Sequence, residues 1–295
     1  MNVNLQFLGL TVVKIVAVLA YVYALLWVMG RSSRLVKVLG IAAAFAIVQI
    51  ALTVKVGKSP ILNTFDAGLL FQACTMTMVA LGLNLIYGFN GQFSLGQWGF
   101  YGIGAYTAAD ITFRWVNRDA RGLLVAGIGV ILGGLLIGGI NRFLRRYRGV
   151  PVLSAFTIYL ISVILAGAAA VFVGNALQPA LAPLFGTKET PGILASPAVL
   201  QVVFVLAALI AGAFAAGVSF LFGLPVLTLG SDYFGIATLG FTIVVNTLMV
   251  NSDTILPFPE MKGGRGMIGI PKLTTWFWAF FFVVLVIIIM RNLVY

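Results

Sequence analysis

The chain is built from long runs of apolar residues that only short polar gaps interrupt. Several runs reach about 20 residues, the helical length that crosses a hydrocarbon core of about 30 Å at about 1.5 Å per residue. Only 8% of the 295 residues are charged, whereas an ordinary soluble domain has about 25%. This argues against a soluble enzyme, a disordered chain and a nucleic-acid-binding module. The sequence therefore predicts an all-α, polytopic integral membrane protein.

The apolar runs predict about nine transmembrane helices, provided that the run at 98–115 crosses fully. We expect these helices over residues 8–29, 38–54, 64–87, 98–115, 122–140, 152–174, 199–222, 234–250 and 274–290. No stretch of the sequence is typical of a soluble domain. We therefore expect a single transmembrane domain over residues 1–295.

Basic residues next to the predicted helices indicate an orientation in the membrane. With nine crossings, the basic residues that follow the first and fifth helices and the last helix fall on one side: Arg31, Arg34, Lys37, Arg142, Arg145, Arg146, Arg148 and Arg291. Lys and Arg next to membrane spans mark the cytoplasmic side. We therefore expect the N-terminus outside the cell and Tyr295 in the cytoplasm, in a multi-pass protein of the inner (plasma) membrane.

Residues that could carry catalysis are scarce. The chain has no histidine, and its one cysteine, Cys74, lies within an apolar run. No mid-span carboxylate pair and no metal-ligand spacing are present, so we expect neither an enzyme nor a metal or cofactor site. The phosphate-binding pattern G-x-x-x-x-G-K-[ST] is also missing. Any ATP hydrolysis must therefore come from another chain.

Two charged residues, Lys14 and Asp110, fall inside predicted helices. An ionisable residue within the membrane is a functional candidate by default. However, Lys14 lies near one end of its helix, where a long side chain can reach the interface. Asp110 precedes Arg114 by four residues, the spacing of an ion pair on one helix face. We favour these structural interpretations for both residues.

The most informative stretch is GFNGQFSLGQWGFYGIGAY, residues 88–106. Glycines this dense break or bend a helix, so the sequence predicts a broken helix here. Two interpretations stay open: the break borders a substrate path, or the glycines allow close helix packing. For a second cluster, Gly133, Gly134, Gly138 and Gly139, we favour close packing, because a G-x-x-x-G pair lets helix backbones approach.

Three motifs occur in the order seen in a known family. Residues 91–107 resemble the G-x-x-S-L-G-x-x-x-F-x-G-x-G-A-Y-T signature of branched-chain amino acid ABC transporter permeases. Residues 223–241 contain segments similar to the family's G-L-P-V-L and A-T-L-x-F. Residues 263–271 resemble its outer loop, G-G-x-x-G-x-x-G-I-P. The match is closest to the M-type permease subunit of the Liv system.

This resemblance implies the permease subunit of an ABC importer for branched-chain amino acids or for related solutes such as urea and short amides. Its implied partners are a second permease subunit, two cytoplasmic ATP-binding cassette subunits and an extracytoplasmic solute-binding protein. The candidate substrate pathway consists of Gly91, Ser94, Gly96, Gln97, Gly102 and Gly104. The glycines would leave room for a solute, while Ser94 and Gln97 would supply polar contacts.

The sequence departs from the family pattern in three places. Residues 120–198 look like an insertion that carries two spans. Gln97 stands where relatives often have histidine. The family continues into a cytoplasmic loop with an R-A-x-R-E-type motif that docks on the ATPase, and this sequence ends at Tyr295 before that loop. The alternative hypothesis is therefore a non-transporting membrane scaffold, or a fragment of a split permease that lacks ATPase coupling.

Overall fold

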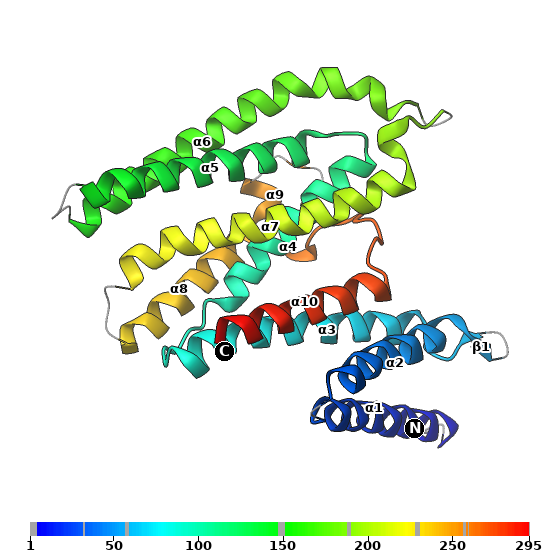
Figure 1. The fold of residues 1–295 in the computed structure, drawn as a ribbon. Coiled ribbons are helices and arrows are strands. Elements are labelled where there is room, and N and C mark those ends of the chain that lie inside the picture. The colour runs from blue at the N-terminus through cyan, green and yellow to red at the C-terminus, as the bar shows by residue number, and fades with distance from the viewer. Residues whose placement is uncertain are drawn as a thin grey trace. The chain divides into compact units, whose positions relative to one another are not determined.

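The computed structural model describes residues 5–294, except 32, 57–58, 147–150, 188–189, 228–230, 256–257 and 259. Nine long helices account for most of these residues (Figure 1): α1 (Leu5–Met29), α2 (Arg34–Thr53), α3 (Thr64–Asn84), α4 (Gln97–Val116), α5 (Arg121–Arg146), α6 (Val152–Leu181), α7 (Pro197–Val226), α8 (Ser231–Val250) and α10 (Trp276–Val294). Each of the nine predicted runs is thus helical, and the predicted all-α membrane fold is confirmed.

The remaining elements are short. They are the two-residue strands β1 (Lys55–Val56) and β2 (Ser59–Pro60), the π-helix η1 (Leu85–Phe89), the 3-10 helices η2 (Ala182–Phe185), η3 (Ile193–Ala195) and η4 (Gly263–Arg265), and the short helix α9 (Ser252–Ile255). The two strands pair antiparallel, with Lys55 opposite Pro60.

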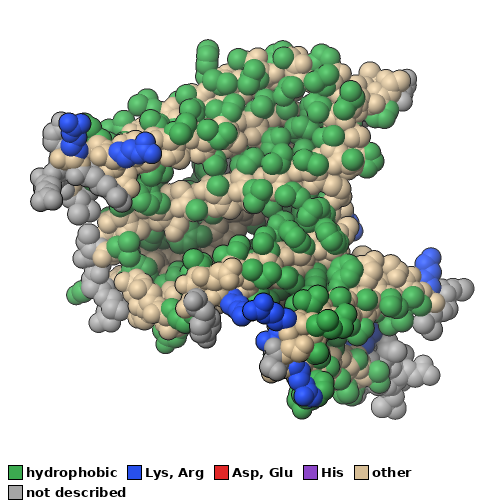
Figure 2. All heavy atoms as spheres, in the orientation of Figure 1, with side chains coloured by type: hydrophobic (Ala, Val, Ile, Leu, Met, Phe, Trp, Pro, Cys, Tyr) green, Lys and Arg blue, Asp and Glu red, His purple; other side chains and the backbone are tan. Residues whose placement is uncertain are grey.

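Seven of the long helices, counted over the described parts of the chain, are long and apolar enough to cross a membrane: α2, α3 with η1, α5, α6, α7, α8 and α10. The helices α6 and α7 have 30 residues each. At about 1.5 Å per residue each is about 45 Å long, so it tilts or extends beyond a hydrocarbon core of about 30 Å. On the face shown in Figure 2, apolar side chains cover the helices and the basic side chains form a few small groups.

The chain divides into two compact units. The first comprises residues 1–78 and 274–295, and the second comprises residues 79–273. The core of the first unit contains Val48 of α2 with Trp276 and Ala279 of α10. The indole N–H of Trp276 donates a hydrogen bond of 3.0 Å to the carbonyl of Phe45, which fixes α10 against α2.

Lys14 has a partner in this first unit that the sequence did not reveal. Its Nζ lies 2.6 Å from Oδ2 of Asp66, in the first turn of α3. Asp66 also accepts the backbone N–H of Asn63 at 3.1 Å, and its own N–H donates to the Asn63 side chain at 2.9 Å. This reciprocal cap satisfies free donors at the start of α3. Lys14 therefore pairs with a carboxylate in the first turn of α3 instead of only reaching the interface.

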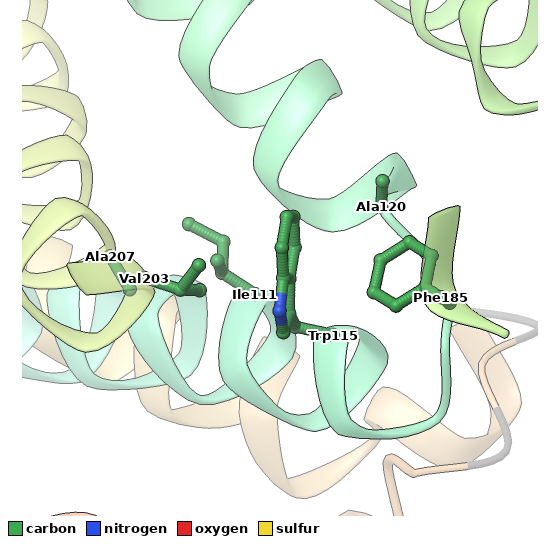
Figure 3. Close-up of a cluster of buried hydrophobic side chains, with 6 residues drawn as sticks. All are labelled: Ile111, Trp115, Ala120, Phe185, Val203 and Ala207. Atoms are coloured by element: carbon green, nitrogen blue, oxygen red, sulfur yellow. The ribbon is translucent and has the colours of Figure 1, made fainter. Parts of the chain in front are cut away.

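Helix α4 is the centre of the second unit, where it packs against α5, α7 and α8, while α5 runs alongside α6 (Figure 1). The core lies at the C-terminal end of α4 (Figure 3), and its buried side chains are Ile111, Trp115, Ala120, Phe185, Val203 and Ala207. The ring centroids of Trp115 and Phe185 are 5.0 Å apart. The surrounding helices explain how α4 can carry Asp110 and Arg114, since charges within membrane bundles face protein rather than lipid.

The expected close packing through the second glycine cluster is wrong within the chain that the structure describes. A Cβ built on Gly133, Gly134, Gly138 or Gly139 of α5 would meet no neighbouring atom within 4 Å. Close packing of α5 occurs elsewhere, through Gly174 of α6, where a Cβ would lie 2.6 Å from Cγ2 of Val125.

Candidate functional site

The predicted break separates α3 from α4. The π-helix η1 ends α3, residues 91–96 form no regular structure, and α4 begins at Gln97. A Cβ on Gly88 would strike the amide end of the Asn84 side chain, so a larger residue at this position would require that side chain to move. Single π-turns inside longer helices occur frequently at functional sites.

Gly91 makes the turn after the π-helix. Its φ of +68° lies in the left-handed region, which glycine adopts without steric penalty. The Asn90 side chain donates a hydrogen bond of 3.0 Å to that of Gln92, and the N–H of Gln92 donates to the carbonyl of Ile86 at 3.3 Å. No atom lies within 4 Å of the Cβ position of Gly91, so this residue borders open space.

Two threonines of α8 hold the broken segment in place. The N–H of Leu95 donates to Oγ1 of Thr238 at 3.0 Å, and Oγ1 of Thr242 donates to the carbonyl of Leu95 at 2.8 Å. These two bonds satisfy backbone groups of Leu95 that no helix or strand satisfies. The sequence analysis assigned no role to either threonine. Their i, i+4 spacing on one helix face was the signal that could have identified them.

Ser94 and Gly96 lie within the broken segment that contacts α8. The buried Ser94 hydroxyl accepts the N–H of Gly96 at 3.3 Å. A Cβ on Gly96 would lie 3.3 Å from Cβ of Thr238. Both predicted site residues therefore shape the break itself and lie against protein.

Further along α4, the glycines face neighbouring helices. A Cβ on Gly99 would lie 2.8 Å from the Phe241 ring, and one on Gly102 would lie 2.9 Å from Sδ of Met249. Gly104 faces α7, with ordinary contacts of 3.9 Å. Gly96, Gly99 and Gly102 thus form one face of α4 that approaches α8 closely. The structure therefore supports the close-packing interpretation of these glycines, while a substrate path at the break stays a prediction.

Gln97 presents a free polar group at the break. Within the described chain its amide has no hydrogen-bond partner, and its Nε2 lies over Gly82 of α3, 2.8 Å from where a Cβ would be. At the start of the break, Leu85, Ile86, Phe89 and Asn90 line an open hollow with a volume of about 450 Å³. The break therefore combines unfilled space with an amide that can donate and accept hydrogen bonds. A role of the six candidate residues in a solute path stays a prediction.

The other end of α4 carries a cluster of ion pairs around Arg114. Its Nε lies 2.8 Å from Oδ1 of Asp110, which confirms the predicted i, i+4 pair. Its Nη2 lies 2.6 Å from Oε1 of Glu260, and its Nη1 lies 3.6 Å from Oδ2 of Asp119. The sequence analysis did not identify Glu260, because it lies 146 residues away along the chain. Asp119 also accepts three hydrogen bonds from the Arg121 guanidinium, one at Oδ1 and two at Oδ2.

A cavity of about 470 Å³ adjoins this cluster. Asp110, Arg114 and Arg121 line one part of it, and the rest of the lining is mostly apolar, apart from the polar side chains of Thr107 and Asn175. Burial in this region tends to raise the pKa of Asp119, but the hydrogen bonds from Arg121 outweigh it and lower that pKa below its usual value. In the ranges that the structure describes, no group of three or more His, Cys, Asp or Glu residues could hold a metal ion.

Residues 260–273, which we call the glycine loop, fold over the end of α4. Three glycines have positive φ: Gly263 (59°), Gly266 (73°) and Gly269 (80°). A Cβ on Gly263 would also lie 2.7 Å from Oδ1 of Asp253. These conformations explain why the third motif contains glycines at these positions. A Cβ on Gly269 would lie 3.0 Å from the ring of Phe113 in α4, so the loop and the helix are in close contact.

Part of the chain is similar in sequence to known proteins. The model of the family described as branched-chain amino acid transport system / permease component matches residues 66–180, which include η1, the break and all of α4. The chain is 46% identical over 66 residues to the high-affinity branched-chain amino acid transport system permease protein LivM of Escherichia coli (strain K12). That alignment covers 22% of this chain and only 14% of the relative. No solved structure matches the chain.

Proposed function

We infer that the chain, whose residues 66–180 match the branched-chain amino acid transport permease family, is a permease subunit that forms part of a path for small solutes across the membrane. The observation that carries this inference is the break at residues 85–96. Its backbone depends on Thr238 and Thr242, and it adjoins both a hollow and the free amide of Gln97. We propose that this segment lies at membrane depth, where irregular backbone is tolerated only if it is buried in protein or lines a wet cavity.

We propose different roles for the six pathway residues. Gly91, which borders open space, and Gln97, which carries the free amide, would contact the solute directly. The other four, Ser94, Gly96, Gly102 and Gly104, lie against α7 and α8 or within the break and would shape the path. The Gln97 amide suits polar solutes without net charge or with a zwitterionic group, because it both donates and accepts hydrogen bonds.

The proposed solutes are branched-chain amino acids or related small polar molecules such as urea and amides. The proposed partners are a second permease subunit, cytoplasmic ATP-binding cassette subunits and an extracytoplasmic solute-binding protein. The printed function of the matched family supports this set, as does the lack of a phosphate-binding loop in the sequence. Solute would pass by alternating access, in which the partners shift the population between inward-open and outward-open states.

The topology is also a proposal. The N-terminus would lie outside and the C-terminus in the cytoplasm, with the glycine loop on the outer face. The basic residues after α5 support this orientation through the positive-inside rule, although Arg148 among them lies outside the described residues. We further propose that residues 1–295 act as one permease domain and that residues 120–198 are an insertion relative to the family.

The test begins with purification of the chain in mild detergent, followed by reconstitution with the proteins that accompany it. We expect an ATP-binding cassette subunit and a second permease to copurify, and the liposomes to take up labelled leucine on addition of ATP and the solute-binding protein. Recovery of neither partner would contradict the proposal. A stable complex without uptake of leucine, urea or short amides would instead support the scaffold hypothesis.

A matched pair of variants tests the site. Gln97→Leu removes the free amide at the break, and we expect uptake to fall about tenfold, the equivalent of one lost hydrogen bond of about 1.4 kcal/mol. Gln72→Leu makes the same change on the exposed side of α3 and should leave uptake within about twofold. Equal uptake by the two variants would refute the role of Gln97.

A further inference from the structure

We propose that Arg114 is a positioning residue that fastens the glycine loop to α4, so that the loop and the glycine-broken helix move together. This inference deepens the proposed function. Only its consequence for transport rests on that function. The attachment itself is a property of the second unit alone and can be tested without transport.

The contacts of Arg114 join three separate parts of that unit. Within α4 it pairs with Asp110, and at the start of α5 it reaches Asp119. Its third carboxylate partner, Glu260 at 2.6 Å, is the first residue of the glycine loop. The guanidinium carbon also lies 4.7 Å from the ring centroid of Phe258, just before the loop. A planar group with five donors suits such a multiple contact, and a lysine could not reproduce it.

The burial of Glu260 is the strongest evidence that Arg114 holds the glycine loop against α4. The Glu260 side chain is only 1% exposed, and among the described residues Arg114 is its ion-pair partner. Its backbone carbonyl accepts the N–H of Ile268 at 3.1 Å, which closes the loop on itself. A buried carboxylate that loses its partner is strongly destabilised, and the loop can relieve this by carrying Glu260 into water. Removal of Arg114 should therefore release the loop.

The position of Arg114 connects the loop to the proposed path. Gln97 at the break and Arg114 both belong to α4, about 25 Å apart along the helix at about 1.5 Å per residue. A helix held by packing on α7 and α8 transmits a displacement along its axis better than a loop does. A protein that binds the glycine loop would thus act on the break through Arg114 and α4.

Thiol labelling tests the attachment directly. In a chain with Cys74→Ala, we introduce Met261→Cys at a buried position of the loop and measure its reaction with a small neutral maleimide in detergent. We expect Arg114→Met to raise the labelling rate about tenfold or more, because the equilibrium constant for local opening of the loop should rise by the same factor. The control is Ala207→Cys in the core of the unit, whose labelling should not change unless the whole unit loosens.

A rescue distinguishes charge compensation from simple loss of packing. Arg114→Met with Glu260→Gln removes both charges, so labelling of the thiol introduced at position 261 should return most of the way to the rate seen with Arg114 present. Arg114→Lys should give an intermediate rate. Unchanged labelling in Arg114→Met, equal labelling at positions 207 and 261, or failure of the rescue would each overturn the inference.

Uptake then separates this inference from the proposed function. If Arg114 couples the loop to the path, Arg114→Met should raise the KM for the solute-loaded binding protein more than it lowers kcat. Suppose that Arg114→Met increases loop labelling but the unsubstituted complex takes up no solute. That result would support the attachment of the loop by Arg114 and contradict the proposed function. Increased labelling with unchanged uptake kinetics would overturn the coupling.

Discussion

The support that Thr238 gives to the break can be tested with Thr238→Val. The substitution keeps the β-branched shape but removes the oxygen that accepts the N–H of Leu95 at 3.0 Å. Thr238 is only 2% exposed, so water cannot easily replace it. A donor left without a partner costs about 1–3 kcal/mol. For a unit of this size, that loss corresponds to a Tm lower by about 3–10 °C.

Thermal unfolding of the purified protein in detergent, followed by circular dichroism, measures this shift. Thr247→Val is the matched control on the same helix, because the Thr247 hydroxyl bonds only the carbonyl of Ile243 within α8. We expect the control to change Tm by no more than about 2 °C. If Thr238→Val and Thr247→Val unfold at the same temperature, the hydrogen bond to Leu95 does not stabilise the break, and the reasoning fails.

Two further predictions concern glycines. Gly99→Ala should destabilise the protein by about 1–3 kcal/mol, because the added Cβ would lie 2.8 Å from the Phe241 ring. Gly240→Ala is the control: its Cβ would meet no atom within 4 Å, so the substitution should be neutral or stabilising in the same thermal assay. Gly263→Ala should be more destabilising than Gly91→Ala, since both have positive φ but only position 263 also meets a carboxylate oxygen at 2.7 Å. The reverse order in either pair would contradict the contacts described.

Local features of this protein could be predicted from the sequence. The long apolar runs specify helices, since lipid leaves backbone groups no partner outside their own segment. The density of glycine in residues 88–106 predicts the break, which the structure contains at 85–96. The Asp110–Arg114 pair follows from spacing on one helix, and its 2.8 Å contact confirms it.

Contacts between distant segments could not be predicted in this way. Leu95 and Thr238 are 143 residues apart, and Arg114 and Glu260 are 146 apart, so their pairing depends on which helices become neighbours. The packing of the glycines could not be predicted from the sequence either. Gly102 is pressed against α8 while Gly134 meets nothing, although both occur in glycine-rich helices. Residue type indicates that close approach is possible, but only the tertiary arrangement determines where it occurs.

The pair between Lys14 and Asp66 has a consequence for biogenesis. A basic side chain within a membrane helix opposes insertion, by about 2.5–3.5 kcal/mol at the helix centre. Its counter-ion lies 52 residues later, so at about 5–20 residues per second the ribosome delivers it roughly 3–10 s after the lysine. We therefore expect α1 to remain beside the insertion machinery until the start of α3 has been synthesised, and to leave it together with α2 and α3 rather than alone.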